Sequence, residues 1–181
     1  MIATSARRAA TARTSRSASP ATRAERTAAS VLIEQATFDD VDGLALLKWR
    51  DDMDGSSRAE SAVEFAADLD TWWRDHRRSH FAFVARSGEH GIVGAAWVAL
   101  LPRVPRPGQV ERLSADIQSV FVLPEHRGHG IGTELVSAAY QHAVSAGAAK
   151  VVVNSSVGAV SLYRRLGFDV SPVLLVRDAV D

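Results

Sequence analysis

The chain has 181 residues, of which 46% are hydrophobic and 23% charged, and its formal net charge is zero. These proportions are typical of a globular protein with one sizeable core. The absence of cysteine excludes a disulfide framework, a thiolate metal site and a cysteine nucleophile. No stretch approaches the roughly 20 consecutive apolar residues of a membrane-spanning helix, and the first residues lack the apolar region of a secretory signal. We therefore expect a cytoplasmic protein with no membrane partner.

Residues 1–30 form a segment of low complexity, rich in alanine, threonine, serine and arginine. Such a composition cannot offset its ordering entropy, so we predict a disordered tail followed by one domain at 31–181. The tail resembles a transit peptide or a nucleic-acid-binding arm, but a solvated tail or an over-extended start codon is the simpler interpretation. It carries six of the 21 basic residues and only Glu25 of the 21 acids, so the domain is acidic by five charges. We therefore expect no nucleic-acid partner.

The first part of the domain reads as two helices between strands. Val31–Ala36 has strand character, and residues 37–40 supply an N-cap and acids that begin a helix. A second helical period runs from about residue 59 to residue 76. Two β-rich runs, at 81–86 and 92–101, then flank a turn with two glycines and predict an antiparallel hairpin. A turn-rich loop follows at residues 101–108.

The second part of the domain alternates strands and helices. In chain order these are a strand at 116–123, a helix at 133–146, a strand at 150–153, a helix at 158–166 and a last strand at 173–177. A strand, helix and strand in succession predict that residues 116–123 and 150–153 lie parallel. The domain is therefore an α/β (α+β) fold with a mixed, mostly antiparallel sheet flanked by helices.

The most informative segment runs from Val120 to Thr133, where a strand leads through a glycine-rich turn into a helix. Glycines at 128, 130 and 132 allow positive φ angles and bring consecutive N–H groups close to a ligand. The N-terminus of the following helix adds further free N–H groups and a partial positive charge. This combination predicts a phosphate or pyrophosphate site.

Three phosphate motifs compete for this segment. A P-loop requires Gly-Lys-Ser/Thr, whereas the chain has Gly132-Thr133-Glu134. A dinucleotide fingerprint would place its third glycine at position 133, which is threonine, and would lie nearer the start of the domain. The sequence Arg127-x-x-Gly130-x-Gly132 instead matches the acyl-CoA-binding motif of the GNAT (Gcn5-related) N-acetyltransferase superfamily.

A second signature lies about thirty residues further on. The segment from Ser156 to Phe168, with Leu162-Tyr163 and Leu166-Gly167-Phe168, resembles the family pattern N-x-x-A-x-x-L-Y-x-x-L-G-F. Together the two signatures make residues 31–181 resemble a GNAT domain. The resemblance implies a GNAT fold with a splayed parallel pair of fourth and fifth strands, acetyl-CoA as cosubstrate and acetyl transfer to an amine.

The resemblance also implies roles for particular residues. The strand backbone would bond the pantetheine arm, the turn would hold the pyrophosphate, and Asn154 or Ser156 would reach the cofactor. The cofactor-binding set is thus Val120, Phe121, Val122, Arg127, Gly128, His129, Gly130, Ile131, Gly132, Thr133, Asn154 and Ser156. Tyr163 would be the general acid for the leaving thiolate, or would only pack its ring in the core.

A proton acceptor for the amine is less clearly indicated. Asp116 is the first candidate by resemblance and Glu111 the second, although Asp116 could equally be an exposed acid at a strand end, and ordered water could replace a side-chain base. His126 and His129 have no third ligand nearby in the sequence, so we expect no metal.

The acceptor is expected to be an amine of a small molecule or a peptide. The region from Asp39 to Asp70 is rich in acids, which would steer a cationic amine toward it, or would simply form caps and solvated helix faces. Four tryptophans, at 49, 72, 73 and 97, would line an apolar part of the cleft or pack in the core. A homodimer is compatible with the resemblance, but no segment of the sequence specifies one. The competing function is a non-catalytic module that senses acyl-CoA or acts as a scaffold.

Overall fold

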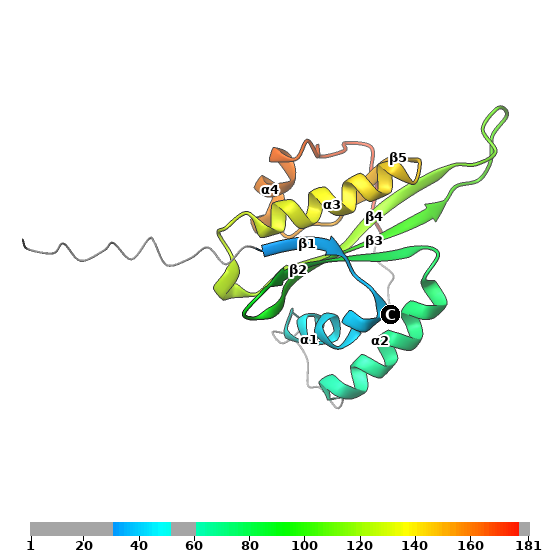
Figure 1. Ribbon diagram of the computed structural model, residues 1–181. Coiled ribbons are helices and arrows are strands. Elements are labelled where there is room, and N and C mark those ends of the chain that lie inside the picture. Colours follow the sequence, from blue (N-terminus) through cyan, green and yellow to red (C-terminus); the bar gives the residue numbers. More distant parts are fainter. Residues whose placement is uncertain (1–30, 52–60, 178–181) are drawn as a thin grey trace, which may run out of the picture.

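The computed structural model describes residues 31–51 and 61–177 (Figure 1). The predicted tail at 1–30 and the start of the second predicted helix, residues 59 and 60, lie outside these ranges. Five strands form one sheet in the order β1-β2-β3-β4-β5. Their bounds are Val31–Gln35 for β1, His80–Ser87 for β2, Gly91–Pro102 for β3, Leu113–Val122 for β4 and Ala148–Val153 for β5.

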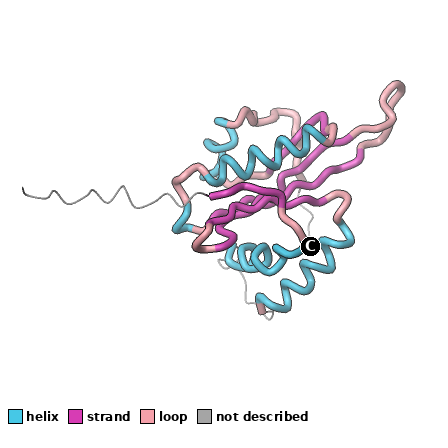
Figure 2. Tube along the Cα trace, viewed as in Figure 1, coloured by secondary structure: helices cyan, strands magenta, loops and turns pink. Residues whose placement is uncertain are grey.

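The pairing of the strands confirms the mixed sheet that the sequence predicts. The pairs β1–β2, β2–β3 and β3–β4 are antiparallel, and β4–β5 is parallel. The parallel pair is joined by the crossover helix α3, Ile131–Ser145. β4 begins at Leu113, three residues before the predicted start, because β3 and β4 remain paired as far as Pro102 and Leu113. Their connection projects from the body as a long hairpin (Figure 2).

Helices cover both faces of the sheet (Figure 1). α1, Val41–Asp51, and α2, Ala62–His76, lie on one face, and α3 and the short α4, Val160–Arg165, lie on the other. Phe81 and Phe83 of β2 contact the His142 ring of α3, with ring centroids 4.3 and 5.6 Å apart. On the opposite face, the Trp97 ring of β3 contacts Trp73 of α2 at 5.0 Å. Because helices cover both faces of the sheet at β3, this strand has a continuous run of buried residues instead of an alternating pattern.

The core is made of aliphatic and aromatic side chains from every layer. Leu135, Val136 and Ala139 of α3 are fully buried against the sheet. Trp73 and Trp97 are buried as well, so these two tryptophans belong to the core, while Trp72 is 40% exposed beside them. No helix of the described ranges is both long and apolar enough to cross a membrane.

The helix starts follow local capping chemistry. Ser61 and Glu64 form a reciprocal capping box at the start of α2: the Ser61 N–H donates to Glu64 Oε2 at 2.8 Å, and the Glu64 N–H donates to Ser61 Oγ at 3.2 Å. Thr37 and Asp40 make the same kind of box before α1, with a Thr37 N–H to Asp40 Oδ2 distance of 3.0 Å. Several acids at this end of the domain therefore have structural roles.

One predicted element is absent. Residues 173–177 form no strand, and the chain after α4 runs as loop and turn (Figure 2). The prediction of a sixth strand at 173–177 was wrong because strand-forming side chains are not sufficient: a strand also needs a neighbour with which to pair its backbone. The first helix, by contrast, follows the predicted capping segment at residues 37–40, and α2 begins at Ala62, after its cap Ser61.

His142 gives the fold a measurable dependence on pH. Its ring lies between α3 and β2, and its buried Nε2 atom has no hydrogen-bond partner among the described residues. Burial lowers the pKa of His142 below its ordinary value of 6.5, so the folded state resists its protonation. The contribution of His142 to the free energy of unfolding should be constant above that ordinary pKa and should fall as the pH drops below it.

Urea unfolding at a series of pH values will measure this effect. A His142→Leu variant should lose part of the acid-side decline, and His90→Leu, at an exposed position in the β2–β3 turn, should follow the parent chain. Identical pH slopes for His142→Leu and the parent would show that His142 is not the group responsible.

Candidate active site

The site begins where two parallel strands separate. β4 and β5 pair only as far as Ile117 and Val153. Beyond this point β5 ends, while β4 continues to Val122, still paired to β3 on its other side. The edge of β4 at 120–122 that faces away from β3 has no strand partner in the described chain. It therefore offers unpaired backbone groups to an extended ligand.

The turn after β4 has the backbone conformation that its glycines allow. Gly128 and Gly130 have φ angles of +80° and +84°, and Gly130 is the N-cap of α3. A Cβ atom built on either glycine would meet nothing within 4 Å. Glycine is required here by the left-handed conformation and not by crowding.

The turn presents a row of free backbone donors. The Thr133 and Glu134 N–H groups donate to Gly130 O at 2.9 and 3.1 Å, and the Arg127 N–H donates to Pro124 O at 3.2 Å. Between them, the N–H groups of residues 128–132 donate to no acceptor in the described ranges. Five successive free donors at the positive end of a 15-residue helix make a site for an anion with several oxygens.

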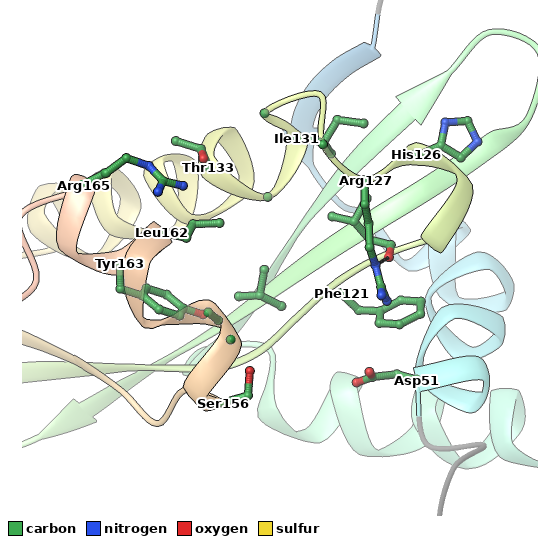
Figure 3. A pocket seen from close by; sticks show the side chains of 17 residues that line it. Asp51, Phe121, His126, Arg127, Ile131, Thr133, Ser156, Leu162, Tyr163 and Arg165 are labelled. Carbon is green, nitrogen blue, oxygen red and sulfur yellow. Dashed lines mark hydrogen bonds between the residues drawn. The ribbon is translucent and has the colours of Figure 1, made fainter.

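Four of these five residues, all except His129, line a cleft of about 590 Å³ (Figure 3). One side of the cleft is β4 and the turn, and the other is η5, Val157–Ala159, together with α4. Most of the residues assigned from the sequence meet here: Val120, Phe121, Val122, Arg127, Gly128, Gly130, Ile131, Gly132, Thr133, Ser156 and Tyr163 all line it. The two signatures thus form opposite walls of one cleft.

Three residues assigned from the sequence do not line the cleft. His129 is exposed on the outside of the turn, and Asn154 is exposed just after β5. Ser156, not Asn154, is the polar side chain of that loop that faces the cleft (Figure 3). Asp116 lies opposite Val152, in the part of β4 that is still paired with β5, and so precedes the fork.

Tyr163 joins the cleft wall to the core. The residue is only 7% exposed, its ring packs edge-on against Phe168 at 5.6 Å, and its hydroxyl end points into the cleft (Figure 3). Burial raises the pKa of Tyr163 above its ordinary value of 10.0, so the phenol stays protonated through neutral pH. The cleft therefore contains one buried group that can donate a proton.

The cleft has an uneven distribution of charge. Arg127 of the turn and Arg165 of α4 line opposite walls of the cleft, and Asp51, at the end of α1, lines it on the side of Phe121 (Figure 3). The Arg127 Nε atom donates to Val122 O at 2.8 Å, and its guanidinium lies 5.4 Å from the Phe121 ring centroid. The two guanidinium groups suit phosphates, and the carboxylate of Asp51 suits an amine.

Sequence reasoning missed several lining residues. Ala159, Leu162 and Arg165 recur at intervals of three along one side of the second signature, and this helical spacing was the signal that could have identified them. Gly158 and His126 carried no such signal. Among the described residues, no group of three or more histidine, aspartate or glutamate side chains is arranged to hold a metal ion.

Three described acids of the acidic region have structural partners, and a fourth lines the cleft. Asp40 forms an ion pair with Arg86 at 2.8 Å, Asp70 pairs with Arg74 at 2.7 Å, and Glu64 belongs to a capping box. Asp51, whose Oδ2 is 3.8 Å from Lys48 Nζ, is the described acid of this region that lines the cleft. Three further acids, Asp52, Asp54 and Glu60, lie outside the described residues.

Comparisons with known proteins agree with this geometry. The chain is 35% identical over 77 residues to the glucosamine 6-phosphate N-acetyltransferase of Trypanosoma brucei brucei, which is 42% of this chain and 50% of that protein. It is 39% identical over 67 residues to an uncharacterized N-acetyltransferase of Methanocaldococcus jannaschii, which is 35% of this chain and 30% of that protein. The matches thus span half or less of these curated relatives.

Solved structures share the fold at low identity. An acetyltransferase from Clostridium acetobutylicum, solved with acetyl-CoA, has a TM-score of 0.67 at 17% identity and covers 82% of this chain and 96% of that one. The glucosamine-6-phosphate N-acetyltransferase of Arabidopsis thaliana has a TM-score of 0.66 at 18% identity, covering 82% and 98%. The model of the Acetyltransferase (GNAT) family matches residues 44–168, which is most of the chain and includes the fork, the glycine turn and both cleft walls. With two signatures on one cleft in this fold, the chain belongs to the GNAT acetyltransferase family.

Proposed function

We propose that the chain is an acetyl-CoA-dependent N-acetyltransferase, an acyltransferase that moves the acetyl group of acetyl-CoA to a primary amine. The observation that carries this proposal is the row of free N–H groups at residues 128–132, in a cleft that also contains Tyr163. The row would hold the pyrophosphate, with Arg127 or Arg165 adding a cation near the phosphates. The open edge of β4 at 120–122 would bond the amides of the pantetheine arm.

In the proposed reaction the amine nitrogen forms a bond to the acetyl carbonyl carbon, and the bond from that carbon to sulfur breaks. The thioester supplies the activated acetyl group. The buried Tyr163 hydroxyl would protonate the leaving thiolate, whose parent thiol has an ordinary pKa near 8.5. A backbone N–H of β4 would stabilise the oxyanion of the tetrahedral intermediate.

The amine must lose a proton before or during attack. Asp116 remains our candidate acceptor of that proton, acting through water because it precedes the fork and does not line the cleft. Asp116 pairs with Ala99 of β3, two residues from Trp97, so it points to the face of the sheet that carries α1 and α2. Asp51, at the end of α1, lines the cleft and would attract the ammonium form of the acceptor.

The acceptor we propose is a small-molecule or peptide amine. Glucosamine 6-phosphate is the first compound to test, because a relative with 35% identity over the aligned segment carries that name. Coenzyme A release should be measured with a thiol reagent over amino sugar phosphates, polyamines, aminoglycosides and peptides. We expect acetyl-CoA to be consumed only when an amine is added. Binding of coenzyme A without turnover on any amine would favour a sensor or scaffold.

Two glycines provide a matched test of the anion site. Gly130 and Gly108 both have positive φ, +84° and +79°, and both have open space where a Cβ would go, but only Gly130 lines the cleft. Gly130→Ala and Gly108→Ala should each cost about 1 kcal/mol of unfolding free energy from left-handed strain. Only Gly130→Ala should also weaken coenzyme A binding, roughly tenfold or more. The strained turn would no longer align its N–H groups with the phosphates, and charge-assisted hydrogen bonds would be lost. Calorimetric titration will measure this, and equal affinities for the two variants would refute the anion site.

The two tyrosines of the chain provide a matched test of the proton donor. Tyr163 and Tyr140 both pack edge-on against Phe168, at 5.6 and 5.9 Å, but only Tyr163 reaches the cleft. Tyr163→Phe should lower kcat roughly 100-fold or more, with little change in the affinity for acetyl-CoA. Tyr140→Phe should retain the parent kcat. Steady-state kinetics will decide, and an unchanged kcat in Tyr163→Phe would remove the role of this residue as general acid.

A further inference from the structure

A second pocket lies at the β1 edge of the sheet, far along the strand order from the cleft. β1 pairs with β2 only as far as Gln35 and Phe83. The chain then turns away from the sheet into η2, Phe38–Asp40, while β2 extends to His80 without a strand partner on this side (Figure 1). A pocket of about 260 Å³ occupies this gap, and none of its lining residues lines the cleft. The pocket is therefore separate from the site of the proposed acetyl transfer.

The walls of this pocket are largely aromatic. Trp73 of α2, Phe38 of η2 and Phe81 of β2 all line it, and Trp73 is only 4% exposed. The rings of Phe38 and Trp73 contact each other with 4.7 Å between centroids. Aromatic rings favour edge-on and offset contacts with a further ring. The volume is below the roughly 300–1,000 Å³ of sites for drug-sized ligands, so the pocket suits a ligand with a single ring.

The lining of the pocket carries one formal positive charge and no acid. Arg77, the exposed C-cap of α2, lines the pocket, and one of its guanidinium N–H groups donates to Arg74 O at 2.8 Å. Nearby acids pair with other residues, Asp70 with Arg74 and Asp40 with Arg86, and no described carboxylate pairs with Arg77. Its remaining N–H groups are therefore available to an anionic ligand.

His80 adds a backbone donor to the pocket. Burial, together with the nearby His76, lowers the pKa of His80 below its ordinary value of 6.5, so its ring is neutral at neutral pH. The His80 carbonyl accepts the Trp73 indole N–H at 3.0 Å on the side of β2 that β1 has left. The His80 N–H points to the same side, and it donates to no backbone acceptor in the described ranges.

We propose that this pocket binds a small aromatic carboxylate, with its ring against Phe38 and Trp73 and its carboxylate at Arg77 and the His80 N–H. A singly charged carboxylate matches the lining better than a phosphate dianion, because the lining supplies one formal charge. The ring accounts for the aromatic walls, which acetate would leave in contact with water. This inference is independent of the proposed acetyl transfer.

Calorimetric titration of the full chain at neutral pH tests the proposal. The probes are benzoate, phenylacetate and 3-phenylpropionate, which hold the carboxylate at three distances from the ring. At least one should bind with a Kd of about 1 mM or lower, a reasonable affinity for so few atoms. The amide of that acid lacks the charge and acetate lacks the ring, so both should bind roughly tenfold more weakly or worse. Failure of all three acids to bind would overturn the proposal.

Arg77 and Arg78 provide a matched pair of variants. Both are exposed and adjacent in the chain, but only Arg77 lines the pocket. Arg77→Gln should weaken binding of the best acid roughly tenfold and remove its advantage over the amide. Arg78→Gln should retain the parent affinity, and both variants should bind coenzyme A as the parent chain does. Circular dichroism and urea unfolding will show that both variants fold.

Three further outcomes contradict the proposal. Equal affinities for the acid and its amide would show that the carboxylate makes no specific contact. An equal loss of affinity in Arg77→Gln and Arg78→Gln would indicate attraction to surface charge instead of binding in the pocket. Displacement of the acid by coenzyme A would place the acid in the cleft.

Discussion

The separation of β4 from β5 after Ile117 and Val153 is the constraint on which the rest of the site depends. A parallel pair that continued to Val122 would close the open edge of β4 and leave no cleft. Because β5 ends, the chain can turn back through η5 and α4 and place Tyr163 opposite the glycine turn. The fork therefore makes the open edge of β4, the glycine turn and Tyr163 parts of one cleft.

The free donors of the turn are compatible with a stable fold because water can reach them. Gly128 and Gly130 are exposed, so their unpaired N–H groups do not incur the desolvation cost of a buried donor. The apolar residues that fix the helix, Leu135 and Val136, lie one turn further on and are fully buried. The core thus holds the N-terminus of α3 in place, while the groups that would bind an anion remain solvated.

Arg127 occupies part of the edge that an extended ligand would use. Its Nε donates to Val122 O, and its guanidinium lies near the Phe121 ring. An amide of a ligand arm that bonds the same carbonyl must compete with this side chain. Arg127 therefore combines two properties: its backbone begins the turn, and its side chain bonds one carbonyl of the open edge, that of Val122.

Local signals in the sequence predicted most of the fold and most of the cleft lining. Glycine spacing located the turn, and the strand, helix and strand order predicted the parallel pair. The sequence could not show where that pair would separate, and so it could not show that Asp116, at the predicted start of the strand, lies before the fork and does not line the cleft. His129 fits the motif by position but faces outward, because the direction of a side chain within a turn depends on φ and ψ angles that composition does not reveal. The expected strand at 173–177 failed for a related reason, since pairing requires a partner that the pattern of one segment cannot supply.

Tyr163 connects the cleft to the open edge of the sheet. Its side chain lines the cleft on one side and the groove beside β5 on the other, so a single aromatic ring forms the wall between them. Packing against Phe168 holds the ring from the core, and the groove on its other side is lined by β5 and by the chain as far as Leu174. Whatever fills that groove therefore becomes part of the support for the proposed proton donor.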